Sequence, residues 1–168
     1  MPVIDQLCVH CGLCCDSTLF ADVELQPEDD FKRLSQSPLA LAKKGRRKMA
    51  FAQPCACFDG KFCKIYANRP AQCRLFECGL LKRVAAGEMT AEMALKKISE
   101  TKRFVKAVHG LLVALGQRPG TRPLSQCYAD AMRAPIELAR GGDMADLHGQ
   151  LMQAYLDLME LVQKDFLR

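Results

Sequence analysis

The chain has 168 residues, a hydrophobic fraction of 49%, a charged fraction of 26% and a formal net charge of +5. These values are typical of one soluble globular domain, and so mild a positive charge does not by itself indicate nucleic-acid binding. No apolar run is long enough to cross a bilayer, and the first residues lack the basic and apolar regions of a secretory signal. We therefore expect a cytoplasmic protein, in which dense cysteines usually serve metal or redox chemistry.

The chain begins with a dense cysteine run that holds four thiols: Cys8, Cys11, Cys14 and Cys15. C-x-x-C spacing places two sulfurs on one side of a tight turn, where both can bind one metal ion, and Gly12 suits such a turn. Neighbouring side chains tend to diverge. Cys14 and Cys15 therefore fit ligands to two different metals, or one ligand and one spare thiol, better than two ligands to one ion. His10 lies inside the C-x-x-C pair, and we expect it to point away from a metal.

The segment after the cysteine run carries weaker signals. Polar and apolar residues alternate loosely from Thr18 to Leu25, which predicts a short strand. Pro27 is followed by three acidic residues, which predicts a short helix that starts there and runs through Leu34. For the basic run from Lys43 to Lys48 we expect a mobile, solvated loop. Contact with an anion or a nucleic acid is the alternative for this run.

A second cysteine segment spans residues 54–78 and holds five thiols: Cys55, Cys57, Cys63, Cys73 and Cys78. Asp59-Gly60 is a strong turn signal. It predicts a hairpin that brings Cys63 close to Cys55 or Cys57. Arg69-Pro70 predicts a further bend, because a residue before proline avoids the helical region. We expect the last two thiols to lie on a short turn or at a helix start.

Together these residues resemble the YkgJ-type cysteine-cluster family, which is described as a zinc- or iron-chelating domain. The family pattern C-x-x-C-x-x-C-C matches residues 8–15, and C-x-I-Y-x-x-R-P-x-x-C-R-x-F-x-C matches residues 63–78 without gaps. Between them the family has C-x-F-L, in which Cys55 aligns with the cysteine and Cys57 with the phenylalanine. The resemblance covers about the first half of the chain. It implies eight metal ligands: Cys8, Cys11, Cys14, Cys15, Cys55, Cys63, Cys73 and Cys78.

Eight thiolates suffice for two four-sulfur sites, or for one cluster and one structural ion. Tetrahedral zinc and a [4Fe–4S] cluster both take four thiolates, so the spacing leaves zinc and iron open. The family's link to flagellin lysine N-methylases, which resemble iron–sulfur proteins, favours iron. A four-thiolate site carries a formal charge of about −2. Arg69 and Arg74, and also Lys61 and Lys64, are candidates to offset this charge and to donate hydrogen bonds to sulfur. The alternative is that they are surface charges.

Beyond Cys78 the pattern becomes helical. From Thr90 to Leu115 apolar residues recur at three- and four-residue steps, and Thr101 fills the one gap in the stripe. This pattern predicts one long amphipathic helix that Gly116 ends.

The remaining segment predicts two more helices. Ser125 is a candidate N-cap for the first, which Pro135 breaks or kinks. Gly141-Gly142 is a further stop, after which Asp143 caps a final amphipathic helix. Cys127 stands alone, and we expect it to act as a small buried hydrophobe. We interpret these helices as a scaffold, with a partner or dimer surface as the alternative.

The sequence thus predicts a mainly α protein with little β. An irregular cysteine-rich region over residues 1–80 packs on amphipathic helices over residues 81–168, within one compact domain. The leading function is metal binding, with an iron–sulfur cluster or zinc as the cofactor. The alternatives are a cluster-dependent modifying enzyme, such as a protein lysine methyltransferase, and a zinc-stapled adaptor for protein or RNA.

Other features limit these alternatives. The methyltransferase has no recognisable S-adenosylmethionine loop to support it. Five disulfides in an exported protein fit the sequence less well than metal ligation does, and a thioredoxin-like redox pair fits least. A protein partner is left open, a membrane is not expected, and a nucleic acid is disfavoured.

Overall fold

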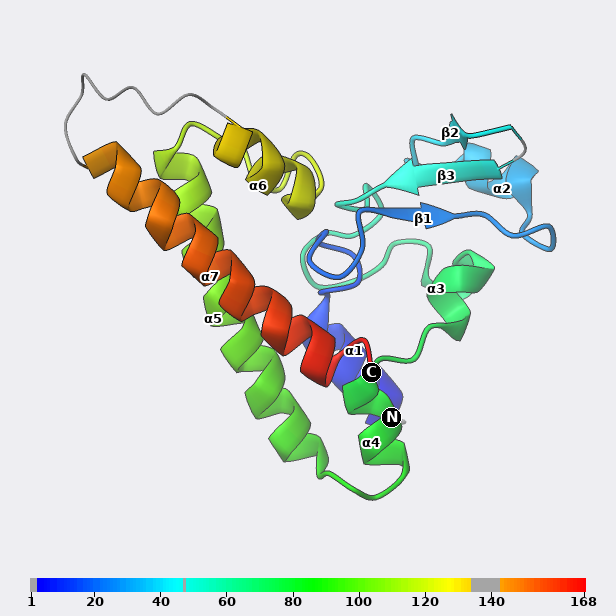
Figure 1. The fold of residues 1–168 in the computed structure, drawn as a ribbon. Coiled ribbons are helices and arrows are strands. Elements are labelled where there is room, and N and C mark those ends of the chain that lie inside the picture. The colour runs from blue at the N-terminus through cyan, green and yellow to red at the C-terminus, as the bar shows by residue number, and fades with distance from the viewer. Residues whose placement is uncertain (1–2, 47, 134–142) are drawn as a thin grey trace.

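The computed structural model describes residues 3–46, 48–133 and 143–168, and in these it is mainly helical with one small sheet (Figure 1). The helices are α1 (Val3–Cys11), α2 (Phe31–Ser35), α3 (Ala71–Leu75), α4 (Gly79–Ala85), α5 (Ala91–Ala114), α6 (Leu124–Arg133) and α7 (Asp143–Asp165), with a 3₁₀ turn η1 (Tyr66–Asn68). The strands are β1 (Asp22–Glu24), β2 (Ala42–Lys44) and β3 (Lys48–Ala52). The predicted fold class, mainly α with little β, is confirmed.

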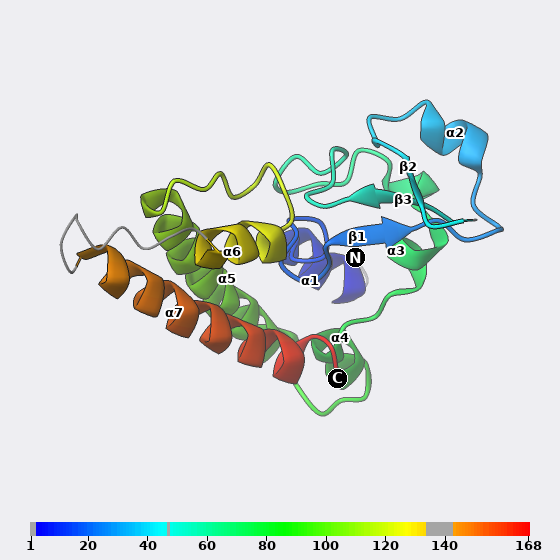
Figure 2. The same cartoon turned by 45° about the horizontal axis from the view of Figure 1, so that its top comes forward.

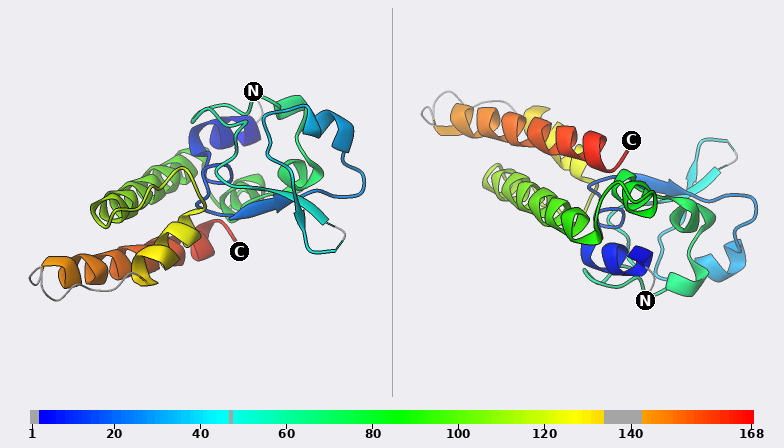
Figure 3. Two further views of the ribbon diagram at one scale, coloured as in Figure 1. Left: turned by 90° about the horizontal axis from the view of Figure 1, so that it is seen from above. Right: turned by 90° about the horizontal axis from the view of Figure 1, so that it is seen from below.

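The two long helices α5 and α7 lie side by side and contribute much of the larger core (Figures 1 and 3). α5 starts where the sequence predicts, because the Thr90 hydroxyl accepts a hydrogen bond from the backbone N–H of Met93 at 3.2 Å. Its buried residues recur with the helical period: Ala94, Ile98, Thr101, Val105, Val108 and Leu112. Gly116, with φ of 76°, follows the last turn. The predicted long helix is therefore confirmed.

A buried ion pair fixes the end of α7. The Asp165 side chain is only 1% exposed, and its two oxygens lie 2.7 Å from Arg83 Nη2 and 2.8 Å from Lys97 Nζ. Burial alone would raise the pKa of this carboxyl, but the hydrogen bonds from Lys97 and Arg83 outweigh it and lower the pKa. The pair ties α4 and α5 to the end of α7.

The sheet is antiparallel, with strand order β1-β3-β2. Val23 on β1 lies opposite Phe51 on β3, and both point into a second, smaller core: Val23, Leu34, Leu39, Phe51 and Cys57. The predicted strand from Thr18 to Leu25 is thus confirmed over three residues only.

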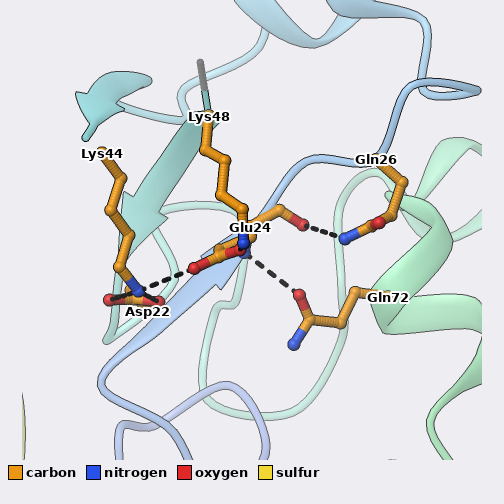
Figure 4. A network of polar contacts seen from close by, with 6 residues as sticks. All are labelled: Asp22, Glu24, Gln26, Lys44, Lys48 and Gln72. Carbon is orange, nitrogen blue, oxygen red and sulfur yellow. Dashed lines mark hydrogen bonds and ion pairs between the residues drawn. The ribbon is translucent and has the colours of Figure 1, made fainter. Parts of the chain in front are cut away.

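The described residues of the basic run from Lys43 to Lys48 are exposed, as expected, but the run is not simply a loop. Its first part belongs to β2, and Lys48 begins β3. Lys44 Nζ lies 2.8 Å from Asp22 and 3.0 Å from Glu24, and Lys48 Nζ lies 2.6 Å from Glu24 (Figure 4). Acidic residues on β1 pair with these lysines, and local sequence does not reveal that pairing.

α2 begins later than predicted. Its N-cap is Asp30, whose carboxylate accepts a hydrogen bond from Arg33 N at 3.0 Å, and so the helix does not start at Pro27. The neighbouring Asp29 accepts instead from the backbone N–H groups of Gln26 and Ala71, at 2.8 and 2.6 Å. Asp29 therefore joins this turn to α3 and does not extend the helix.

α6 also differs from prediction at its start. It begins at Leu124, one residue before the predicted cap Ser125, and Leu124 N donates to Ser17 Oγ at 3.2 Å. Ser17, which lies shortly after the first cysteine run, thus accepts a hydrogen bond from the first backbone N–H of this helix. The predicted break at Pro135 and the stop at Gly141-Gly142 lie outside the described residues, as does the side chain of Asp143.

The N-terminal cysteine run is attached to the helical part of the molecule. Leu7 of α1 and Leu13 share the larger core with α5, α6 and α7, and α1 packs on α5 (Figure 2). The division near residue 80 stays a prediction. In the described part of the chain, no helix is both long and apolar enough to cross a membrane.

Candidate metal centre

The first cysteine run combines the end of a helix with a tight turn. Cys8 and Cys11 both belong to α1, one helical turn apart, and so the turn follows Cys11 and does not lie between them as we expected. Gly12 has φ of 73°, and its carbonyl accepts hydrogen bonds from Cys15 N at 2.8 Å and Asp16 N at 3.1 Å. This turn places Cys14 and Cys15 directly beside α1.

The ring of Phe58 packs against this turn. A Cβ added at Gly12 would lie 2.5 Å from the tip of the Phe58 ring and would displace this ring, and the positive φ of residue 12 also favours glycine. Cys55 N also donates to Cys15 O at 2.8 Å. These two contacts bring the second cysteine segment against the first.

The predicted hairpin in the second segment is present as a tight turn. Asp59 Oδ1 accepts from Lys61 N and Phe62 N at 2.9 and 2.7 Å, and Gly60 has φ of 96°. Phe58 and Cys63 then form an antiparallel bridge. The turn therefore brings Cys63 back alongside the segment that holds Cys55.

Two short helices place the last two thiols. Cys73 lies on α3, and the neighbouring Gln72 accepts from Glu24 N at 3.1 Å through its side-chain oxygen (Figure 4). Cys78 is the N-cap residue of α4. Gly79, which follows it, donates from its N–H to Phe166 O at 2.9 Å. The expectation of a short turn or helix start is confirmed at both positions.

One group of thiols gathers where α1 meets α4: Cys8, Cys11, Cys14 and Cys78. Burial raises the pKa of Cys11 to about 12, and repulsion from the Cys78 and Cys8 thiolates adds to this rise. The pKa of Cys14 is also raised well above its usual value, first by burial and then by repulsion, with Cys11 the strongest contributor and Cys15 the next. Cys11, Cys14 and Cys78 pack against the larger core.

A second group gathers near the smaller core: Cys15, Cys55, Cys63 and Cys73. Burial raises the pKa of Cys15 to about 12, and three thiolates add to it by repulsion: Cys55, Cys73 and Cys63. Burial likewise raises the pKa of Cys73 to about 12, and Cys55 and Cys63 again add to the rise. The eight candidate ligands thus fall into two neighbourhoods of four thiols.

None of the ten cysteines, all of which lie in the described part of the chain, forms a disulfide bond. Within residues 3–46, 48–133 and 143–168, no three cysteine, histidine or carboxylate side chains already converge closely enough to hold a metal ion. The thiols of each group are neighbours, and they would have to turn inward to share an ion. Their number and type suit zinc or iron, because both metals take four thiolates.

One cysteine stands apart from these groups. Cys127 is fully buried in the larger core, and the prediction of a small buried hydrophobe is confirmed. Cys57 is fully buried in the smaller core beside the second group: burial raises its pKa, repulsion from Cys63 adds to the rise, and its own charge adds to the rise that burial causes in the pKa of Cys55. His10 is exposed, and its carbonyl accepts from Lys102 Nζ at 2.6 Å.

Arg69 and Arg74 lie beside the second group. The Arg69 guanidinium stacks over the Tyr66 ring at 3.6 Å, and its positive charge opposes the rise in the pKa of Cys73. Arg74 Nη1 donates to Arg69 O at 3.1 Å. Whether either residue also contacts a bound metal site stays a prediction.

Sequence reasoning did not single out several residues that position the thiols: Ser17, Phe58, Gln72 and Gly79. Their partners are distant in the chain, so no local pattern identifies them. Gly79 carries the one available signal, since a glycine directly after a candidate ligand indicates close backbone packing.

Comparison of the chain with curated proteins and with solved structures found no significant match. A family match covers residues 7–107, which include all eight candidate ligands. The matched family is CxxCxxCC, described as a "Putative zinc- or iron-chelating domain". Because this match spans more than half of the 168 residues, the chain belongs to the CxxCxxCC family of zinc- or iron-chelating domains.

Proposed function

We propose that the chain binds metal through two four-thiolate sites. Site 1 consists of Cys8, Cys11, Cys14 and Cys78, and site 2 consists of Cys15, Cys55, Cys63 and Cys73. The observation that carries this proposal is the grouping of the thiols: beyond the effect of burial, charges on Cys11, Cys78 and Cys8 raise the pKa of Cys14, whereas charges on Cys55, Cys73 and Cys63 raise the pKa of Cys15. Cys14 and Cys15 are adjacent in sequence and belong to different sites.

The electrostatics of each group favour a bound cation. Four thiolates in a half-buried neighbourhood repel one another, and without a countercharge they stay protonated at neutral pH. A zinc ion or an iron–sulfur core supplies that countercharge and releases protons on binding. When bound, such a group would staple the loops together, and it would supply either Lewis acidity or electron transfer.

The two sites would draw on different parts of the fold. Site 1 joins α1 to α4 through thiols that pack on the larger core. Site 2 joins the first cysteine run to the hairpin and α3, beside the smaller core. The Arg69 charge, already close enough to influence Cys73, would offset part of the negative charge of site 2.

Metal analysis with a visible spectrum of anaerobically purified protein tests this proposal. Brown protein with broad absorption near ~400 nm and about four iron per occupied site would identify iron–sulfur clusters. Colourless protein with about one zinc per site would identify zinc. Protein that folds and carries neither metal above trace amounts, even after reconstitution, would refute metal binding.

No observation favours the two alternative functions. The RNA adaptor rested on the basic run, but Lys44 and Lys48 of that run pair with Asp22 and Glu24 on the sheet. The methyltransferase hypothesis gains no binding loop for S-adenosylmethionine from the described residues. We therefore propose metal binding alone.

A further inference from the structure

A cluster of unpaired cations surrounds the segment that carries two ligands of site 2. These cations are Lys61, Lys64, Arg69 and Arg74. In the described chain none of the four forms an ion pair, whereas cations elsewhere do: Lys44, Lys48, Arg83, Lys97, Arg122 and Arg133. The nearest acid of the hairpin, Asp59, is engaged by the backbone N–H groups of its own turn. The segment from residue 61 to residue 75 contains these four cations and no acidic residue, so its own charge is positive.

The same segment exposes three large apolar side chains. Phe62 is 51% exposed, Tyr66 is 43% exposed and Leu75 is 74% exposed. Single exposed apolar residues are common, but three within one short, positively charged segment are typical of an interaction surface. Aromatic residues and arginines are also the residue types enriched in protein interfaces.

A polar cavity of about 140 Å³ opens between this segment and α2. Three arginines line it: Arg33, Arg69 and Arg74. The carboxylates in its wall are Glu28, Asp29 and Asp30, of which the two aspartates already accept hydrogen bonds from backbone N–H groups. Arg69 Nε is buried and finds no acceptor in the described chain. The cavity thus has guanidinium groups with spare hydrogen-bond donors.

We infer that this surface docks an acidic protein, one of whose carboxylates enters the cavity between Arg33, Arg69 and Arg74. A carboxylate suits the planar guanidinium group, which can bind both of its oxygens at once. The exposed side chains of Phe62, Tyr66 and Leu75 would supply the apolar contact of such an interface. The inference rests on the proposed function in one respect: the docked partner would lie beside Cys63 and Cys73, where it could exchange metal or electrons with site 2.

The geometry favours a protein over a nucleic acid. Single-stranded nucleic acids bind by stacking bases on exposed aromatic rings, but here a cation already covers one ring face of each aromatic. Lys61 Nζ lies 5.1 Å from the Phe62 ring centre, and the Arg69 guanidinium lies 3.6 Å from that of Tyr66.

Fluorescence anisotropy of a labelled peptide, made of glutamate with interspersed leucine, tests the inference at about 0.15 M salt. The double variant Arg33→Gln and Arg74→Gln removes two charges from the cavity. The matched control, Arg103→Gln and Lys106→Gln, removes two charges from an exposed face of α5. We expect the cavity variant to weaken binding about tenfold and the control to change it less than about twofold. Leu75→Asp should weaken binding as well.

Three results would overturn the inference. The first is no binding of the peptide, and the second is equal binding to the cavity and control variants. The third is tighter binding of a single-stranded RNA of equal charge. Metal content is measured on every sample. If metal-loaded protein does not bind the peptide, only the proposed docking surface is refuted. Protein without metal refutes the proposed function instead.

Discussion

Gly79 illustrates how tightly the chain is packed next to a proposed ligand. A Cβ at this position would lie 2.6 Å from Arg168 O and 2.8 Å from Asp165 O, and both of these are backbone atoms that cannot rotate away. The close approach holds the start of α4 against the end of α7. It therefore also fixes the backbone of Cys78.

We predict that Gly79→Ala destabilises the protein by about 2 kcal/mol, the usual cost of overpacking a rigid site. The control Gly110→Ala on α5 has nothing within 4 Å of the added Cβ. It should be neutral or should stabilise by about 0.5 kcal/mol, because alanine favours a helix. Urea unfolding measures both. Equal stabilities of the two variants would show that the close approach at Gly79 has no energetic importance.

Asp165 gives the second prediction at this scale. Its pKa is lowered in the folded protein, so its ionised form stabilises the fold at any pH above the unfolded carboxyl value of 3.8. That contribution is lost as the pH falls through the lowered folded value. Asp165→Asn should therefore cost about 3 kcal/mol at pH 7, because Arg83 and Lys97 lose their shared partner.

The difference in unfolding free energy between parent and Asp165→Asn should shrink as the pH falls below about 4. Chemical denaturation at a series of pH values measures it, and the difference cancels contributions from the thiols that both proteins share. The control is Asp130→Asn, whose ion pairs with Arg122 and Arg133 are exposed. It should change the unfolding free energy far less than Asp165→Asn does. A cost for Asp165→Asn that stays the same at pH 7 and pH 3 would contradict this role.

At the scale of elements, the sequence predicts helices and strands best where one local pattern alone determines the element. The 3.6-residue period and the Thr90 cap define α5 almost to the residue, because burial of one face and capping are local properties. The strands β2 and β3 were missed, because a basic run is held in the sheet by Asp22 and Glu24, which lie about twenty residues earlier. α2 begins later than predicted for a similar reason. The Asp29 carboxylate accepts a hydrogen bond from the backbone N–H of Ala71 on α3, and so it does not cap α2.

Gln72 provides the prediction at the scale of elements. Its side-chain oxygen accepts from Glu24 N at 3.1 Å and joins α3, which carries Cys73, to β1. Gln72→Ala should cost about 1 kcal/mol, since it leaves a half-buried backbone donor unsatisfied. It should also weaken metal binding at site 2 but not at site 1. Lys44→Ala, which removes an exposed ion pair of the same sheet, is the matched control. A competition titration with a chelator measures affinity. Equal losses at both sites would contradict the local role of Gln72.

At the scale of the whole molecule, two cores are joined by the first cysteine run. Leu7 and Leu13 belong to the larger core, while Cys55 N donates to Cys15 O beside the smaller one. The family resemblance implied the eight candidate ligands, but the sequence could not divide them into sites. That division depends on contacts distant in the chain, such as the docking of Gly79 against α7, which brings Cys78 to α1.

The central claim is that the eight thiols form two independent sites, and the metal content of double cysteine variants tests it most directly. Cys14→Ser and Cys15→Ser should each lose about half of the metal. Adding Cys78→Ser to Cys14→Ser should cost no more metal, because both thiols belong to site 1. Adding Cys55→Ser to Cys14→Ser should remove nearly all of it, because one ligand of each site is then lost. Cys127→Ala should keep the full content.

Inductively coupled plasma analysis of the folded variants measures these contents against protein concentration. Our account predicts a full content for the parent, half for the single and same-site double variants, and none for the cross-site double variant. If Cys14→Ser alone emptied the protein, or if the same-site and cross-site double variants held equal metal, two independent four-thiolate sites would be excluded.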